Sequence, residues 1–166
     1  MVMKPIFAIV LLLLTIIEAK AQSRETLVRS KDWFGFKYTE GDSYSCYMTT
    51  EPIAKQGKHN NRGYVNAYVT HRPLYGEYDE VSFHMGHPIK KNSANLVINS
   101  NDYSLVTAKN WAFSQNKKTD KDIIAAMKRG SKMVVFSTSN LGSRTKDTYS
   151  LMGFTKVYNG LKNACK

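Results

Sequence analysis

Residues 147–155 read DTYSLMGFT, and the chain ends eleven residues later. The segment is too short to span a bilayer, which takes about 20 apolar residues, and it is too apolar for a solvated tail. It must therefore pack against the protein. Its TYSLMGF part (148–154) has the pattern of a strand. The following TKVYNGLKNAC carries an apolar stripe at helical spacing, made of Val157 or Tyr158, Leu161 and Cys165. We predict a last strand that turns into a short C-terminal helix.

Most of the chain upstream of this segment shows strand patterns. Strands are predicted in WFGFKY (33–38), DSYSCYMTT (42–50), YVNAYVTH (64–71), EVSFHM (80–85), WAF (111–113) and KMVVFSTS (132–139). NLVIN (95–99) and DYSLVT (102–107) flank a turn and predict a hairpin. In the fourth strand, Val81, Phe83 and Met85 are expected to point inward, and Ser82 and His84 outward.

One internal helix is predicted in TDKDIIAAMKRG (119–130). Thr119 and Asp122 have the spacing of a capping pattern, and Gly130 is a typical residue at a helix end. Together these patterns predict a mainly β fold, a single antiparallel β-sandwich or partly closed barrel with two short helices at about 119–130 and 155–165. No repeat or linker divides the chain, so one domain is expected.

The N-terminal residues have the three parts of a secretory signal peptide. Lys4 supplies positive charge, residues 5–17 are almost entirely apolar, and Ala19-Lys20-Ala21 forms a small-x-small cleavage site. Cleavage after Ala21 leaves a domain of residues 22–166. An uncleaved anchor is the alternative, although the apolar run is shorter than a membrane span. We expect a periplasmic or secreted protein with no transmembrane anchor after cleavage.

The chain is strongly basic, with a formal net charge of +11 that falls to +10 without residues 1–21. Such an excess suggests an anionic partner; a solvated basic surface is the alternative. Export argues against nucleic acid, although Tyr64 and Tyr68 resemble a stacking platform. Positive charge at a helix start opposes the helix dipole, so a structural role alone does not explain the lysines there. We predict that an anionic envelope or host-surface component is contacted by Lys117, Lys118 and Lys121, together with Lys90 and Lys91.

Three motifs suggest chemistry, and none is expected to support it. Gly41-Asp42-Ser43 resembles an esterase nucleophile block, but no later Asp-x-x-His supplies the base, and a turn explains it. His84 and His87 could suggest copper, yet strand positions three apart point to opposite faces. No catalytic residue, metal or cofactor is therefore predicted.

An uncharacterised envelope hydrolase that uses the region of residues 71–87 is the alternative function. Such an enzyme would need a pocket in which His71 or His84 approaches a carboxylate, from Glu77, Asp79 or Glu80.

Two cysteines, Cys46 and Cys165, follow the predicted signal peptide. An even number of cysteines in an oxidising compartment favours pairing. A disulfide between them would close nearly the whole domain into one loop. Two buried thiols are the alternative.

Several segments follow one another in a specific order. They are SCYMTTEP (45–52), THRP (70–73), DEVSF (79–83), and a run over 123–165 in which an AAMKRG helix end, an apolar strand, TKDTYSLMGF and an amphipathic terminus appear in turn. In this order they resemble the invasion-associated locus B (IalB) family of alphaproteobacterial exported proteins. The resemblance covers roughly residues 33–165.

The resemblance implies an exported protein associated with host-cell invasion or cell-envelope function, and it brings no active-site motif. We therefore expect a non-enzymatic binding or interaction protein. It also implies that the C-terminal segment closes the β domain. Leu151 and Phe154 would cap the core, and Gly153 would allow the corner between strand and helix.

Overall fold

The computed structural model describes residues 22–57 and 62–165. The predicted signal peptide and its cleavage lie outside these residues. The strands are β1 (Gln22–Ser30), β2 (Trp33–Glu40), β3 (Ser43–Thr50), β4 (Ala54–Gln56), β5 (Asn66–Arg72), β6 (Glu77–His84), β7 (Ile89–Ile98), β8 (Asn101–Ala108), β9 (Trp111–Phe113), β10 (Lys132–Ser139) and β11 (Arg144–Ser150). The helices are α1 (Lys117–Arg129), α2 (Phe154–Ala164) and the short 3-10 helix η1 (Pro73–Tyr75).

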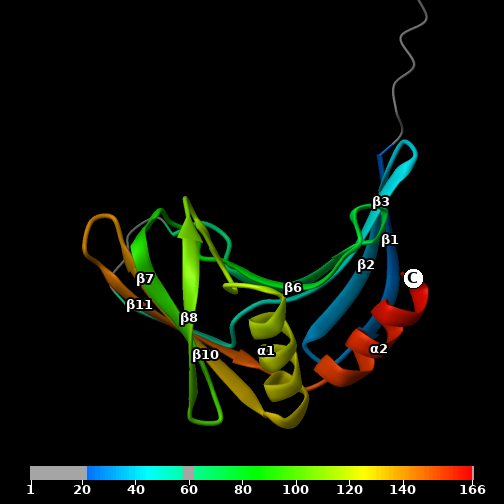
Figure 1. Ribbon diagram of the computed structural model, residues 1–166. Coiled ribbons are helices and arrows are strands. Elements are labelled where there is room, and N and C mark those ends of the chain that lie inside the picture. Colours follow the sequence, from blue (N-terminus) through cyan, green and yellow to red (C-terminus); the bar gives the residue numbers. More distant parts are fainter. Residues whose placement is uncertain (1–21, 58–61, 166) are drawn as a thin grey trace, which may run out of the picture.

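The strands form one antiparallel sheet of 11 strands in the order β1-β2-β3-β5-β6-β9-β8-β7-β10-β11-β4, which does not close. In Figure 1, β6 crosses the middle and connects a part with β1–β3 to a part with β7, β8, β10 and β11. Strand β8 joins the two parts, because residues 101–105 pair with β7 and residues 106–108 pair with β9. The predicted mainly β fold with two helices is confirmed.

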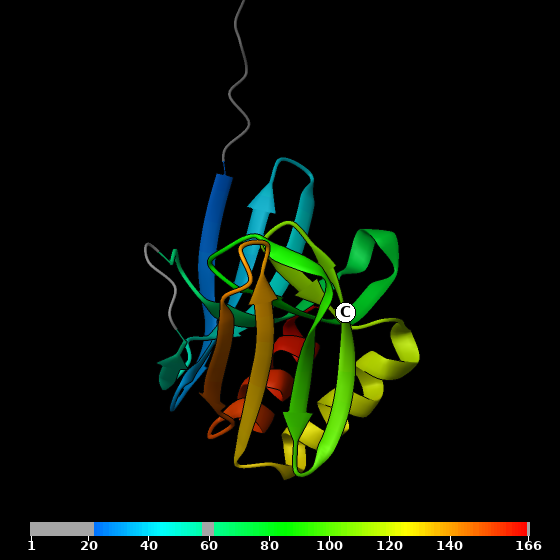
Figure 2. The same cartoon turned by 90° about the vertical axis from the view of Figure 1, so that its left-hand side faces the viewer.

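The core lies between the two parts of this bent sheet. Phe83 of β6 and Tyr149 of β11 are both fully buried, and their ring centroids are 6.2 Å apart. Val81, Phe83 and Met85 point into this core, as predicted. Both helices lie on the same side, α2 against β1–β3 and α1 against β6 and α2, as Figures 1 and 2 show from two directions. Among the described residues, no helix covers the opposite face of β2, β3 and β5.

Helix α1 begins two residues earlier than predicted, and the capping pattern at Thr119 and Asp122 is wrong. The N-cap is Asn116, whose side chain accepts hydrogen bonds from the backbone N–H groups of Lys118 and Thr119 at 3.0 Å. Asp122 lies beyond the first turn of α1. The buried Asp120 accepts the N–H of Val81 at 2.8 Å and the hydroxyl of Ser114, which ties α1 to β6.

The C-terminal corner decides where α2 lies. Strand β11 ends at Ser150, earlier than predicted, and Gly153 turns the chain with φ 91°. A Cβ on Gly153 would overlap the carbonyl of Ser30, so only glycine fits this left-handed position. Leu151 and Phe154 are buried in the core, as the family resemblance implies.

Trp33 holds this corner against the start of β2. Its indole N–H donates to the carbonyl of Ser150 at 3.0 Å, and its ring meets the edge of Phe154 with centroids 5.0 Å apart. The pairing expected for the cysteines is also present. Cys46 of β3 and Cys165 after α2 form a disulfide with a Cα–Cα distance of 6.3 Å, and both are buried. The last helix is thus attached to an early strand by side chains and by a covalent bond.

A buried ion pair holds the segment between β4 and β5 against β11. Arg62 binds both carboxylate oxygens of Asp147, with one Nη1–Oδ1 distance of 2.7 Å, and its Nε donates to the carbonyl of Met85 at 2.8 Å. The side chain of Asp147 is 0% exposed and that of Arg62 is 11% exposed. One guanidinium therefore connects three parts of the chain.

Candidate binding groove on the outer face of the sheet

The face of β2, β3 and β5 that turns away from α2 carries a row of aromatic side chains. Because side chains alternate along a strand, burial of Trp33, Cys46 and Met48 on the helix side leaves the intervening aromatic residues on the other side. These are Phe34, Phe36, Tyr47 and Tyr68, and β9 adds Trp111 and Phe113; all are half-buried.

The rings contact one another across the strands. Ring centroids are 5.4 Å apart for Phe36 and Tyr47, 6.2 Å for Tyr47 and Tyr68, and 5.5 Å for Tyr68 and Trp111. These distances are typical of interacting aromatic pairs. The row is therefore continuous across β2, β3, β5 and β9.

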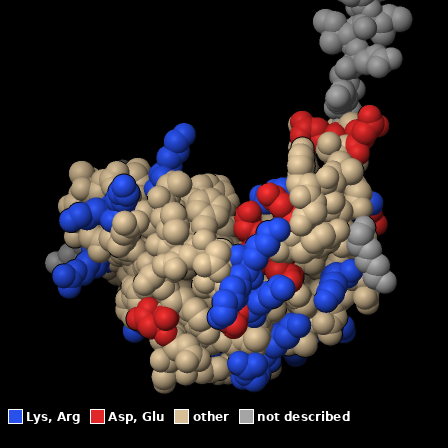
Figure 3. Space-filling model, in the orientation of Figure 1, with Lys and Arg blue, Asp and Glu red and all other residues tan. Residues whose placement is uncertain are grey.

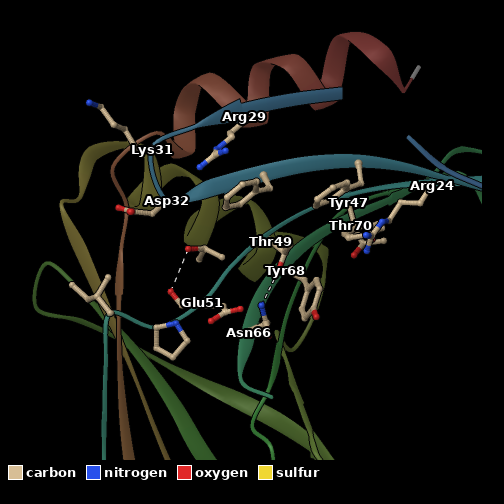
Figure 4. A pocket seen from close by; sticks show the side chains of 15 residues that line it. Arg24, Arg29, Lys31, Asp32, Tyr47, Thr49, Glu51, Asn66, Tyr68 and Thr70 are labelled. Atoms are coloured by element: carbon tan, nitrogen blue, oxygen red, sulfur yellow. Dashed lines mark hydrogen bonds between the residues drawn. The ribbon is translucent and has the colours of Figure 1, made fainter. Parts of the chain in front are cut away.

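The β2–β5 part of this row forms the wall of a groove of about 740 Å³. Its volume lies within the usual range for ligand sites. Figure 4 shows its lining side chains on the side of β2 that faces away from α2. Polar groups lie among the rings, and they include Thr49, Asn66 and Thr70 with the carboxylates of Asp32 and Glu51. Burial raises the pKa of Tyr68 above its usual value.

Two arginines of β1 lie over the phenylalanine rings. The guanidinium carbon of Arg24 is 5.1 Å from the ring centroid of Phe36, and that of Arg29 is 4.8 Å from the ring centroid of Phe34. Positions five apart in a regular strand point to opposite faces. The pairing of β1 with β2 shifts register between Thr26 and Val28, and this irregularity brings both arginines to the aromatic face.

The arginine side chains are held by stacking and not by acids. Neither Arg24 nor Arg29 forms an ion pair or a hydrogen bond from its side chain within residues 22–57 and 62–165. A guanidinium held by an aromatic ring keeps its N–H donors available for another partner. The groove therefore presents two positioned cations beside an aromatic wall.

The outward direction predicted for His84 is confirmed, but its side chain is not exposed. It lies on the face opposite Phe83 but is only 6% exposed, because Tyr64 stacks on it at 3.8 Å and the edge of Trp111 meets it at 4.8 Å. Its Nδ1–H donates to the carbonyl of Tyr64 at 2.9 Å. In the described part of the chain, no group of three His, Cys, Asp or Glu side chains could hold a metal ion.

His71 meets the condition set for the enzyme alternative, because it lines a pocket of about 460 Å³ together with the carboxylate of Asp79. Its Nε2–H donates to Asp79 at 3.1 Å, and the same carboxylate oxygen accepts the hydroxyl of Tyr158 at 2.8 Å. A nucleophile would have to bind the other ring nitrogen, yet Nδ1 of His71 is buried and has no hydrogen-bond partner among the described residues. His71 also lies opposite Cys46 on the neighbouring strand. The cluster connects β5, β6 and α2 beside the disulfide.

The carboxylate of Asp79 is expected to make the protein sensitive to acid. Its hydrogen bond from His71, aided by the one from Tyr158, lowers the pKa of Asp79 in the folded state. The charged form is thus favoured by folding, so this contribution is present above the usual carboxyl pKa of about 4 and is lost as pH falls through the lowered value. Urea unfolding between pH 2 and 6 should show that the free energy of unfolding falls more steeply with acidification for wild type than for Asp79→Asn.

At pH 7, Asp79→Ala should cost about 1–3 kcal/mol, because His71 and Tyr158 lose their shared acceptor. Equal acid sensitivity of wild type and Asp79→Asn would contradict this role.

The lysines predicted to contact an anion lie on two elements. Lys117, Lys118 and Lys121 are exposed in the first turns of α1, and Lys90 and Lys91 are exposed on β7. Lys118 is paired with Asp122 at 2.7 Å. In Figure 3, lysines and arginines gather over α1 and α2, while β7 belongs to another part of the molecule. Contact between these lysines and an anion stays a prediction.

Comparison with protein families identifies the C-terminal part of the chain. Residues 95–162 match the model of the Invasion associated locus B (IalB) protein family. Over these residues the chain is similar to the IalB family. The IalB match runs from β7 into α2 and includes Asp147 and Gly153. No curated protein and no solved structure matches the chain.

The aromatic groove lies outside the IalB match, because β1, β2, β3 and β5 all precede residue 95. Sequence reasoning predicted the strands that carry its rings but missed Arg24 and Arg29. The sequence of β1 alone has no signal for the register shift that aligns them. Within the residues described, no helix combines the length and apolarity that a membrane crossing requires.

Proposed function

We propose that this protein is an exported, non-enzymatic binding protein of the IalB family that acts at the cell envelope or in host-cell invasion and holds its partner in the aromatic groove. The groove is the observation that carries the proposal. It combines a suitable volume, a continuous aromatic wall and cations without acidic partners. Aromatic residues and arginine are the side chains enriched at energetically important binding positions.

Export is supported by two observations. The N-terminal residues have the pattern of a signal peptide, and a disulfide joins Cys46 to Cys165. Disulfides persist mainly in oxidising compartments such as the periplasm or the extracellular space. A periplasmic or secreted location follows from the proposal.

The five lysines named above are proposed to assist this function from outside the groove. A net charge of +10 on residues 22–166 attracts anionic surfaces over several ångströms. This attraction is screened beyond about 8 Å at physiological salt. We assign to these lysines a general, salt-sensitive attraction and to the groove the specific contact.

A double substitution, Tyr47→Ala with Tyr68→Ala, tests the proposal. Both rings line the groove, so their removal should weaken binding of labelled residues 22–166 to bacterial envelopes or cultured animal cells by about tenfold or more. Binding is measured as a saturation curve, and a thermal melt verifies that the variant folds. Tyr75→Ala is the matched control, because Tyr75 is 72% exposed and does not line the groove. Unchanged binding of a folded double variant to both surfaces would refute the proposal.

A further inference from the structure

The groove has the features that a sugar polymer requires. A pyranose ring has one face made of C–H groups, which packs on an aromatic ring, and a periphery of hydroxyl groups. The half-buried Tyr47 and Tyr68 offer such rings, and Thr49, Asn66 and Thr70 offer hydrogen-bonding groups beside them. Aromatic rings supply much contact area, and the tyrosine hydroxyl adds a polar group.

The arginines indicate that the sugar ligand carries negative charge. The guanidinium groups of Arg24 and Arg29 lie over the rings of Phe36 and Phe34, and their planar N–H groups match a carboxylate in a bidentate pair. Lys31 adds a third exposed cation to the same lining. The positive side chains thus lie along one side of the groove, on β1 and the turn that follows it.

The acidic residues of the groove argue against a nucleic acid. Asp32 and Glu51 also line it, and their carboxylates can accept hydrogen bonds from sugar hydroxyls. A nucleic acid carries a phosphate at every nucleotide and would bring like charges close to both carboxylates. A sugar polymer places its carboxylates further apart, with neutral hydroxyl groups between them.

We infer that the groove binds an acidic polysaccharide whose charge is carried by sugar carboxylates, with the rings of Tyr47 and Tyr68 against sugar faces and Arg24 and Arg29 on the carboxylates. The inference rests on the proposed function and specifies its ligand. It assigns a role to the part of the chain that lies outside the IalB match.

The test measures binding of hyaluronan oligosaccharides to residues 22–166 by calorimetry at low salt. The same oligosaccharides with their carboxylates converted to amides are the matched ligand, since this removes the charge and keeps the sugar chain. Arg24→Gln with Arg29→Gln should weaken hyaluronan binding at least tenfold. Lys132→Gln with Lys156→Gln removes the same charge from exposed positions that do not line the groove, and it should weaken hyaluronan binding less than threefold.

Several results would overturn the inference. The first is equal weakening of hyaluronan binding by the two charge variants. The second is binding of the amidated oligosaccharide with the same affinity as hyaluronan. The third is binding to sulfated heparin, single-stranded DNA or phosphatidylglycerol vesicles without binding to hyaluronan. If no polysaccharide binds but Tyr47→Ala with Tyr68→Ala still reduces envelope or cell binding, the inference fails and the proposed function stands. If that variant binds envelopes and cells as wild type does, the proposed function itself fails.

Discussion

Loss of the Cys46–Cys165 disulfide is expected to lower the free energy of unfolding by about 4–5 kcal/mol. The two residues are separated by 119 positions, so the bond closes a very long loop in the unfolded chain. The chain-entropy model gives a stabilisation of this size for loops of roughly 100 residues. For a domain of this length, the melting temperature should fall by about 10–20 °C.

Thermal melts of residues 22–166 with and without reductant measure this effect. Cys46→Ala with Cys165→Ala provides the control, because its melting temperature should be low and should not respond to reductant. A wild-type protein with two titratable thiols and an unchanged melting temperature would contradict the prediction.

The Asp147→Ala substitution is expected to destabilise the protein by about 3–5 kcal/mol. Removing one partner of a buried ion pair leaves the other charge without compensation, and the Arg62 side chain is only 11% exposed. Arg62 also holds the carbonyl of Met85 at 2.8 Å, so it cannot leave the interior without breaking a second contact. Urea unfolding of wild type and variant gives the difference.

Two further variants show whether the cost arises from the unpaired charge. Arg62→Met combined with Asp147→Leu should be more stable than Asp147→Ala alone, because no buried charge then remains. Asp102→Ala is a surface control, since the side chain of Asp102 is exposed and accepts hydrogen bonds from the side chain of Asn95 at 3.0 Å. Similar losses for Asp102→Ala and Asp147→Ala would show that burial of the pair is not the cause.

Local patterns in the sequence predict much of the fold. Alternation over residues 64–71 and 80–85 yields strands β5 and β6, and the apolar spacing of Ile123, Ile124 and Met127 yields α1. Strand β1 is missed, because the side chains of QSRETLVRS are exposed or only half-buried and show no clear alternation. The cap of α1 is missed because several polar residues before the helix could fill that position, and only the folded backbone selects Asn116.

The sequence by itself determined which residues form most strands and both helices, because period-2 and period-3.6 patterns are local properties. It also supplied the cysteines, the glycine at the corner and the basic charge. Only the tertiary structure decided that Arg24 and Arg29 lie over Phe36 and Phe34, and that Asp79 meets His71 and Tyr158. These contacts depend on which strands are neighbours and on the register between them. The alternation of residues along a single strand predicts neither of these. The β1 register shift and the packing of α2 through the disulfide position these groups, since both join parts of the chain that are separate in sequence.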